Sequence, residues 1–132
     1  MTVVVDASVV VKWFVDEPGA DRATAFRSEA MMAPDLILVE VGNALWKHRR
    51  RGVMTAVDYA DAVVALRGAP VALTPVQELL LPAARLAAEL DHPLYDCFYL
   101  ALAMREGCPL VTDDRRLLAV GEPRFGGFIR RL

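Results

Sequence analysis

Long hydrophobic runs are scarce in this chain of 132 residues. Runs such as Val9 to Val11 and Leu79 to Leu81 are far too short for a bilayer, which needs about 20 apolar residues in a row. The start of the chain does not read as a secretion signal, because Asp6 and Lys12 interrupt its apolar stretch. We therefore expect no membrane span and a cytoplasmic location.

Cysteine is almost missing as well. Cys97 and Cys108 are isolated, without a CxxC pair, which argues against both a zinc knuckle and a disulfide framework. We expect both to be small buried side chains.

The chain also lacks an excess of positive charge, since its formal net charge is −2. The cations are unevenly placed, however, with one block at Lys47 to Arg51, another at Arg115 and Arg116, and three arginines near the end. Because nucleic-acid binding depends on the distribution of charge, the net charge does not exclude it. The block from Lys47 to Arg51 could steer RNA or be a solvated helix end favoured by the helix dipole, and these two interpretations are compatible.

The composition, 55% hydrophobic and 24% charged, is typical of a compact globular protein. We expect one domain over residues 1–132, in which strands and helices alternate around a mostly parallel sheet. The expected strands are Val3–Val5, Met31–Pro34, Val71–Leu73, Pro109–Val111 and an edge strand in Gly126–Arg130. The expected helices are Ser8–Val15, Ala20–Ala30, a helix from Asp35 to the Arg49–Gly52 turn, Thr55–Leu66, Pro75–Leu90, one ending at Gly107, and Arg115–Ala119.

The first strand ends at a carboxylate. Val3–Val5 has no polar alternation, which indicates a strand buried on both faces, and Asp6 follows it at the edge where open α/β sheets bind ligands. Ser8 is a candidate N-cap for the next helix. Alternatively, Asp6 is simply a helix cap.

Glu40 interrupts an apolar helix, Asp96 lies in the first turn of another, and Asp114 follows the strand that ends near Thr112. In the helix of Glu40, residues Leu36, Val39, Leu45 and Trp46 are apolar at helical spacing, and Asn43 lies on the same face as Glu40. Carboxylates among apolar residues need a partner. That partner is either a salt bridge, a helix N-terminus or a metal ion.

If Asp6, Glu40, Asp96 and Asp114 converge, they suit Mg²⁺, which prefers oxygen ligands and uses few carboxylates beside water and phosphate. Such a site can activate water for phosphodiester hydrolysis. The four acids would also repel one another, so we expect at least one to be partly protonated in the metal-free protein.

Four segments of the chain carry a family resemblance. They are Val4-Val5-Asp6-Ala7-Ser8, Pro34-Asp35-Leu36-x-x-x-Glu40-x-x-Asn43-x-Leu45, Tyr95-Asp96-x-x-Tyr99-Leu100-Ala101-Leu102-Ala103, and Leu110-Val111-Thr112-x-Asp114-x-Arg116-Leu117. In this order and spread, they resemble a PIN domain of the VapC toxin type, a ribonuclease of bacterial toxin–antitoxin pairs.

The resemblance implies a three-layer α/β domain with a five-stranded sheet, a dimer, and a VapB-type antitoxin as inhibitor. It also implies endonucleolytic cleavage of structured RNA with Mg²⁺ or Mn²⁺. It assigns catalysis and metal binding to Asp6, Glu40, Asp96 and Asp114, and supporting roles to Ser8, Asn43 and Thr112. The chain departs from the family pattern at Cys97 and at Asp113, whose neighbour Asp114 we expect to face the metal because it fits Thr-x-Asp.

Two other functions compete with a nuclease. A phosphoacceptor signalling domain would need a phosphorylatable Asp on an interior strand and a late strand-end Lys, but no Lys follows Lys47. A non-catalytic RNA- or protein-binding relative would gain nothing from clustered acids. Trp13, Phe14 and Trp46 could stack bases but are expected in the core or a dimer interface. His92 could be a general base but is expected to be structural.

Overall fold

The computed structural model describes residues 1–132, and its five strands form one sheet in the order β3-β2-β1-β4-β5. All four strand pairings are parallel. The strands are β1 (Thr2–Val5), β2 (Ala30–Pro34), β3 (Val71–Thr74), β4 (Leu110–Thr112) and β5 (Ile129–Arg131). The predicted α/β fold with a five-stranded sheet is confirmed, and the strand from the C-terminal tail lies at the edge as expected.

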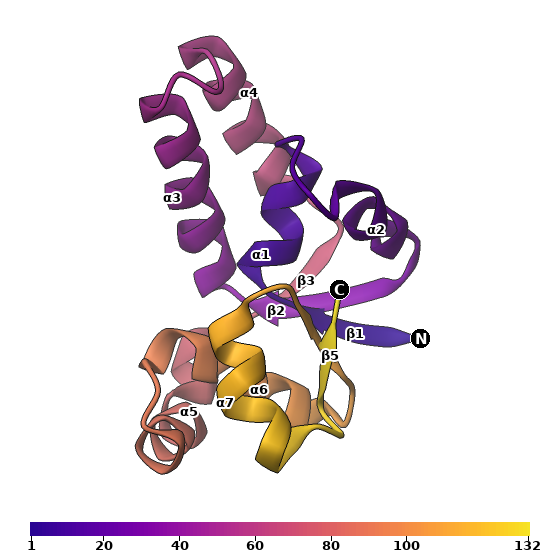
Figure 1. Ribbon diagram of the computed structural model, residues 1–132, viewed down its shortest axis with the longest axis vertical. Coiled ribbons are helices and arrows are strands. Elements are labelled where there is room, and N and C mark those ends of the chain that lie inside the picture. The colour runs from indigo at the N-terminus through magenta and orange to yellow at the C-terminus, as the bar shows by residue number, and fades with distance from the viewer.

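Helices lie on both sides of this sheet (Figure 1). One side carries α1 (Ala7–Val10), α2 (Ala20–Ala25), α3 (Leu36–Arg50) and α4 (Ala56–Arg67), and the other carries α5 (Val76–Leu90), α6 (Leu94–Glu106) and α7 (Arg115–Phe125). Short 3₁₀ segments, η1 (Val11–Trp13) and η2 (Phe26–Ser28), follow α1 and α2. Helices α3 and α4 pack together and project from the sheet as an arm. None of the helices is both long enough and apolar enough to cross a membrane.

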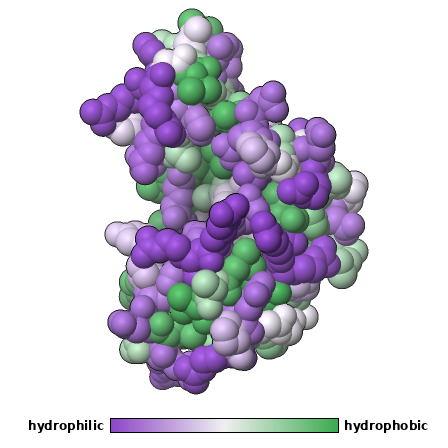
Figure 2. Space-filling view, in the orientation of Figure 1, coloured by the Kyte–Doolittle hydropathy of each residue, from purple (hydrophilic) through white to green (hydrophobic).

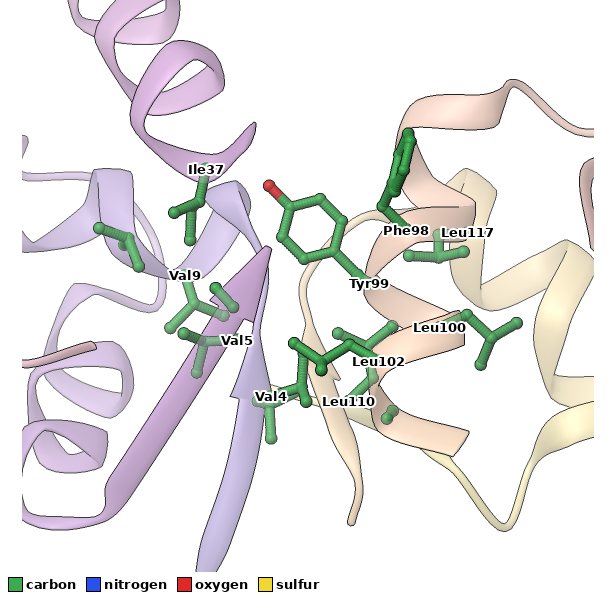
Figure 3. Packing of buried hydrophobic residues seen from close by; sticks show 14 of the residues in the cluster. Val4, Val5, Val9, Ile37, Phe98, Tyr99, Leu100, Leu102, Leu110 and Leu117 are labelled. Carbon is green, nitrogen blue, oxygen red and sulfur yellow. The ribbon is translucent and has the colours of Figure 1, made fainter. Parts of the chain in front are cut away.

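The core is formed where α6 lies against the central strands. Val3, Val4 and Val5 of β1 are completely buried, as their uninterrupted apolar run predicts. Every residue of α6 from Cys97 to Ala103 is buried as well, and Figure 3 shows Leu102 beside Val4 and Leu110. Cys97 and Cys108 are both free and buried, in agreement with the prediction.

The entry into the first helix differs from the prediction. Asp6, not Ser8, is the N-cap, because Asp6 is still extended (φ −101°, ψ 179°) and its carboxylate accepts a hydrogen bond from Ser8 N. The helical segment also ends earlier than expected, since η1 stops at Trp13. Ser8 is thereby inside the first helical turn, and its hydroxyl is free to contact other residues.

The apolar positions of α3 do not all lie in the core. Val39 and Trp46, which are apolar at helical spacing, are 69% and 44% exposed. The buried positions are Ile37, Val41 and Leu45, which are four residues apart and therefore form one stripe along the helix. Helix α3 carries apolar side chains on more than one of its sides, so their spacing alone does not identify the side that packs against the core.

Several helix ends differ as well. Helix α2 ends at Ala25, and Pro75 precedes α5 as its N-cap. Helix α7 continues past Ala119 to Phe125 because Gly121 does not break it. A Cβ atom at Gly121 would come within 2.2 Å of Ile129 Cδ1, so the glycine allows α7 to lie close to β5. Thr55 is the N-cap of α4, and its hydroxyl accepts a hydrogen bond from Asp58 N.

The strand order reverses direction at one position in the sheet. After β1 the chain adds β2 and β3 on one side and β4 and β5 on the other, so the order reverses between β1 and β4. Ligands of open α/β sheets bind at the carboxyl ends of the strands next to such a reversal. Asp6 directly follows β1, and Asp114 follows β4 by two residues.

Candidate active site

Asp6 is the most buried acid of the site, with 5% of its surface exposed. Its Oδ1 accepts hydrogen bonds from Ser8 N at 3.0 Å and Ser8 Oγ at 2.5 Å, and its Oδ2 accepts one from the buried Thr112 hydroxyl. Burial raises the pKa of Asp6 to about 7, and the charges of Asp114 and Asp96 add to this rise against the opposing effect of the hydrogen bonds. The expected protonation of one acid therefore falls on Asp6, mainly through desolvation and less through repulsion.

Asp114 is held by the start of α7. Its Oδ1 accepts from Arg116 N at 2.9 Å and Leu117 N at 3.1 Å, while its own N–H donates to Thr112 Oγ1 at 3.0 Å. The neighbouring Asp113 turns elsewhere, because its Oδ2 lies 3.4 Å from Lys12 Nζ. Of the two adjacent acids, it is Asp114 whose charge acts on Asp6.

Glu40 comes from α3 and is partly buried. Its Oε1 accepts a 2.6 Å hydrogen bond from the hydroxyl of Tyr99, whose ring is buried in the core. Figure 3 shows this hydroxyl pointing out of the core toward α3. Burial raises the pKa of Glu40, the Tyr99 hydrogen bond lowers it, and the charges of Asp96 and Asp114 raise it.

Asp96 lies in the first turn of α6, where the helix dipole favours a negative charge. Its Oδ2 is 2.6 Å from Nε2 of His92, which is 8% exposed. His92 therefore contacts the acid directly, which was not expected from the sequence, although a spacing of four residues is compatible with such a contact.

The structure brings the four acids into one electrostatic neighbourhood from four different elements. Asp96 and Asp114 each raise the pKa of both Asp6 and Glu40. No three acidic, histidine or cysteine side chains are grouped tightly enough to hold one ion together as direct ligands. Mg²⁺ usually takes only one or two carboxylates and keeps several waters, so this all-oxygen donor set still fits such an ion.

The supporting residues named from the sequence separate into two groups. Ser8 and Thr112 both contact Asp6, and their hydroxyl oxygens are 3.4 Å apart. Asn43 is exposed and makes no hydrogen bond to any of the acids, so its role stays a prediction.

The alternative that these acids only cap helices is correct for two of the four. Asp6 caps α1 and Asp114 caps α7. Glu40 and Asp96 cap nothing, however, and are instead held by Tyr99 and His92. A caps-only interpretation therefore leaves two of the four acids unexplained.

Comparison with known proteins identifies the family of this chain. The family model of the PIN domain matches residues 3–123. The chain belongs to the PIN domain family. The crystal structure of PAE2754 from Pyrobaculum aerophilum superposes with a TM-score of 0.66 and 32% sequence identity, covering 91% of this chain and 87% of that one.

Curated relatives extend the likeness over most of the PIN domain. Ribonuclease VapC3 of Pyrobaculum aerophilum is 36% identical over 121 residues, which are 89% of this chain and 92% of the relative. Ribonuclease VapC9 of Mycobacterium tuberculosis is 31% identical over 120 residues, 91% of each protein. A shorter match, 38% over 89 residues, is to Exonuclease VapC9 of Pyrobaculum aerophilum and covers 64% of this chain and 62% of that protein.

The raised pKa of Asp6 predicts how pH affects the metal-free protein. Between the ordinary Asp value of 3.8 and about 7, the folded state keeps a proton on Asp6 that the unfolded state has lost. Stability should therefore fall as pH rises through this window, by at most about 1.4 kcal/mol per pH unit from this group. Urea unfolding in EDTA across the window measures the slope. Asp6→Asn should remove the contribution of Asp6 to this slope, whereas Asp61→Asn on the exposed face of α4 should keep it. If the unfolding free energy of all three proteins depends on pH with the same slope, the raised pKa does not belong to Asp6.

Proposed function

We propose that this protein is a metal-dependent endoribonuclease and acts as the toxin of a VapBC-type toxin–antitoxin pair. The observation that carries the proposal is the gathering of Asp6, Glu40, Asp96 and Asp114 beside the strand reversal of a PIN domain. Relatives at 31–36% identity over about nine tenths of the chain are named VapC ribonucleases, which supports the same reaction class.

The four acids would hold Mg²⁺ or Mn²⁺, some of them through water. When bound, the ion supplies a nucleophilic water near neutral pH and neutralises charge on the attacked phosphate. The chain itself fixes the acids before any ion arrives. Ser8 and Thr112 orient the carboxylate of Asp6, Tyr99 orients Glu40, and His92 orients Asp96. Such supporting contacts are what a preorganised site requires.

The proposed substrate is structured RNA in the cytoplasm, and helix α3 offers a surface for it. Lys47 lies seven residues after Glu40, two turns further along the same face. Trp46, Lys47, Arg50 and Arg51 line one surface depression near the end of the helix, where the Arg50 guanidinium lies 5.6 Å from the centre of the Trp46 ring. Cations bind RNA phosphates, so this end of α3 suits an RNA strand that reaches Glu40.

The competing functions have less support. A phosphoacceptor domain still lacks its late Lys, since Lys47 is the last lysine. A non-catalytic binder of RNA would be weakened by four clustered carboxylates. Burial of Asp6 costs free energy when the carboxylate is ionised, and a non-catalytic binder would gain nothing from that cost.

The projecting arm is the proposed partner surface. The apolar residues near the N-terminus do not provide this surface, because most of them are buried within the domain, among them Val9, Val10 and Val11. Exposed apolar residues occur instead on α3, α4 and the turn between them, and Figure 2 shows hydrophobic patches on the arm. They are Leu38, Val39, Trp46, Val53, Val57, Val63 and Val64. We propose that a second copy of the chain and an antitoxin segment cover them, with an antitoxin arginine entering the acidic site.

The nuclease proposal predicts that RNA cleavage stops in EDTA and returns with Mg²⁺ or Mn²⁺. Asp96→Asn should lose nearly all cleavage, since it removes a carboxylate at constant shape, while Asp61→Asn should keep it. A circular RNA tests the mode of cleavage, because only an endonuclease can open a circle. Cleavage that persists in EDTA would reject the metal mechanism. Degradation of linear RNA without opening of the circle would make the protein an exonuclease.

The partner proposal predicts a dimer by sedimentation at micromolar concentration. Adding the antitoxin encoded beside it should produce a larger complex and inhibit cleavage. Val39→Lys with Val64→Lys should weaken these associations, because both residues are about 70% exposed on the arm and would bring charge into an apolar contact. Leu81→Lys on α5, equally exposed, is the matched control. A monomer that ignores the antitoxin would overturn the proposal.

A further inference from the structure

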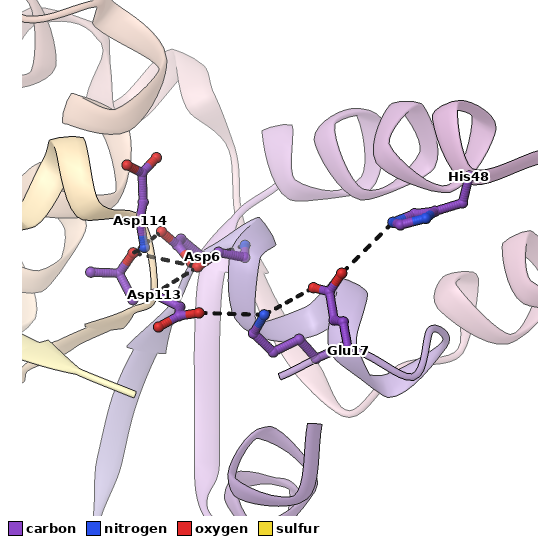
Figure 4. A network of polar contacts seen from close by, with 8 residues as sticks. Asp6, Glu17, His48, Asp113 and Asp114 are labelled. Atoms are coloured by element: carbon purple, nitrogen blue, oxygen red, sulfur yellow. Dashed lines mark hydrogen bonds and ion pairs between the residues drawn. The ribbon is translucent and has the colours of Figure 1, made fainter. Parts of the chain in front are cut away.

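Lys12 is a buried lysine, with 8% of its surface exposed, beside the candidate active site. Its Nζ lies 2.9 Å from Glu17 Oε1 and 3.4 Å from Asp113 Oδ2. A buried ammonium is costly unless carboxylates pair with it, and Lys12 has two such partners. The dashed lines in Figure 4 follow the connection from Asp113 to Glu17 and on to His48.

The segment that carries Lys12 also carries Ser8. The two residues are four apart in the continuous helical run of α1 and η1, so their side chains leave on the same side. Both contact one residue of the turn after β4. Ser8 Oγ accepts a hydrogen bond from Asp113 N at 2.9 Å, and Lys12 pairs with the Asp113 carboxylate. The backbone of Asp113 is therefore bound to Ser8 and its side chain to Lys12.

These two contacts of Asp113 bear on which of the adjacent acids, Asp113 or Asp114, faces the site. Asp114 is the next residue, and the same turn places its N–H on Thr112 Oγ1 and its carboxylate at the start of α7. Without Lys12, the Asp113 carboxylate would lose its ion pair and would be free to turn toward other cations. The turn would then be held by fewer contacts.

Through Glu17, the same ammonium is also linked to helix α3. Glu17, its second partner, has Oε2 at 3.9 Å from Nε2 of His48 on α3, the helix that carries Glu40. Gly19, at φ +92°, lies close enough to Lys12 that a Cβ there would be 3.4 Å from Lys12 Cε. The packing around Lys12 therefore joins the turn of Asp114 to the helix of Glu40.

We propose that Lys12 is a positioning residue of the candidate active site. It holds the Asp113 carboxylate away from the four acids and fixes the turn so that Asp114 faces Asp6. The inference rests on the proposed nuclease function for its catalytic consequence, although the contacts themselves do not depend on it.

A double-mutant cycle tests this role. Lys12→Met and Asp113→Asn should each lower kcat on the order of 10- to 100-fold, as is common for residues that orient ligands, with little change in KM for RNA. The double variant should be no slower than the slower single variant, because both changes remove the same contact. Lys12→Arg, which keeps the charge, should recover part of kcat. Arg105→Met, which removes an exposed ion pair with Glu78, should leave kcat unchanged.

Amide hydrogen exchange gives a second readout that does not need RNA. In Lys12→Met and in Asp113→Asn, the amides of Asp113 and Asp114 should exchange faster, while those of α5 keep the parent rate. If the parent cleaves no RNA, the proposed function fails, and this measurement still tests Lys12. The inference is overturned if the two losses in kcat multiply, if the Asp113 and Asp114 amides keep the parent rate, or if α5 exchanges faster to the same extent. Should Lys12→Met not fold, Asp113→Asn and Lys12→Arg carry the exchange comparison.

Discussion

The burial of one carboxylate, that of Asp6, is the constraint on which the rest of the site depends. An acid placed between the buried strand β1 and helix α1 needs hydrogen-bond donors, and Ser8 and Thr112 supply them from two different parts of the chain. The Thr112 contact joins the ends of β1 and β4 and so fixes the turn from which Asp114 projects. The site is therefore built where the fold pairs its central strands.

Each of the other acids is held by a different element. Glu40 depends on Tyr99, whose ring belongs to the hydrophobic core, and Asp96 depends on His92 just ahead of α6. The packing of the core therefore helps to fix the position of the Glu40 carboxylate through the hydroxyl group of Tyr99. Because protein contacts orient each acid, binding of an ion would require little further ordering of these side chains.

Much of this arrangement follows from the sequence, and the exceptions have physical reasons. The run Val3–Val5 followed by Asp6 predicted a buried strand ending at the site, and the structure has that strand. The Tyr99 contact with Glu40 joins residues 59 apart, and such a pair depends on strand order, which spacing along one helix does not reveal. Lys12 was treated only as an interruption of an apolar stretch, because nothing local indicated that a distant Asp113 would neutralise it. The spacing of apolar residues in α3 did not identify its buried side, because α3 is apolar on more than one side.

The central claim is that Asp6, Glu40, Asp96 and Asp114 form one metal site, and a crystal soaked in Mn²⁺ tests it most directly. Anomalous scattering at the manganese edge locates the ion independently of the assumed chemistry. The account predicts one or two peaks among these four carboxylates, with Asp113 still paired to Lys12. Peaks only at other surface acids, or none at concentrations of Mn²⁺ that support cleavage, would contradict it.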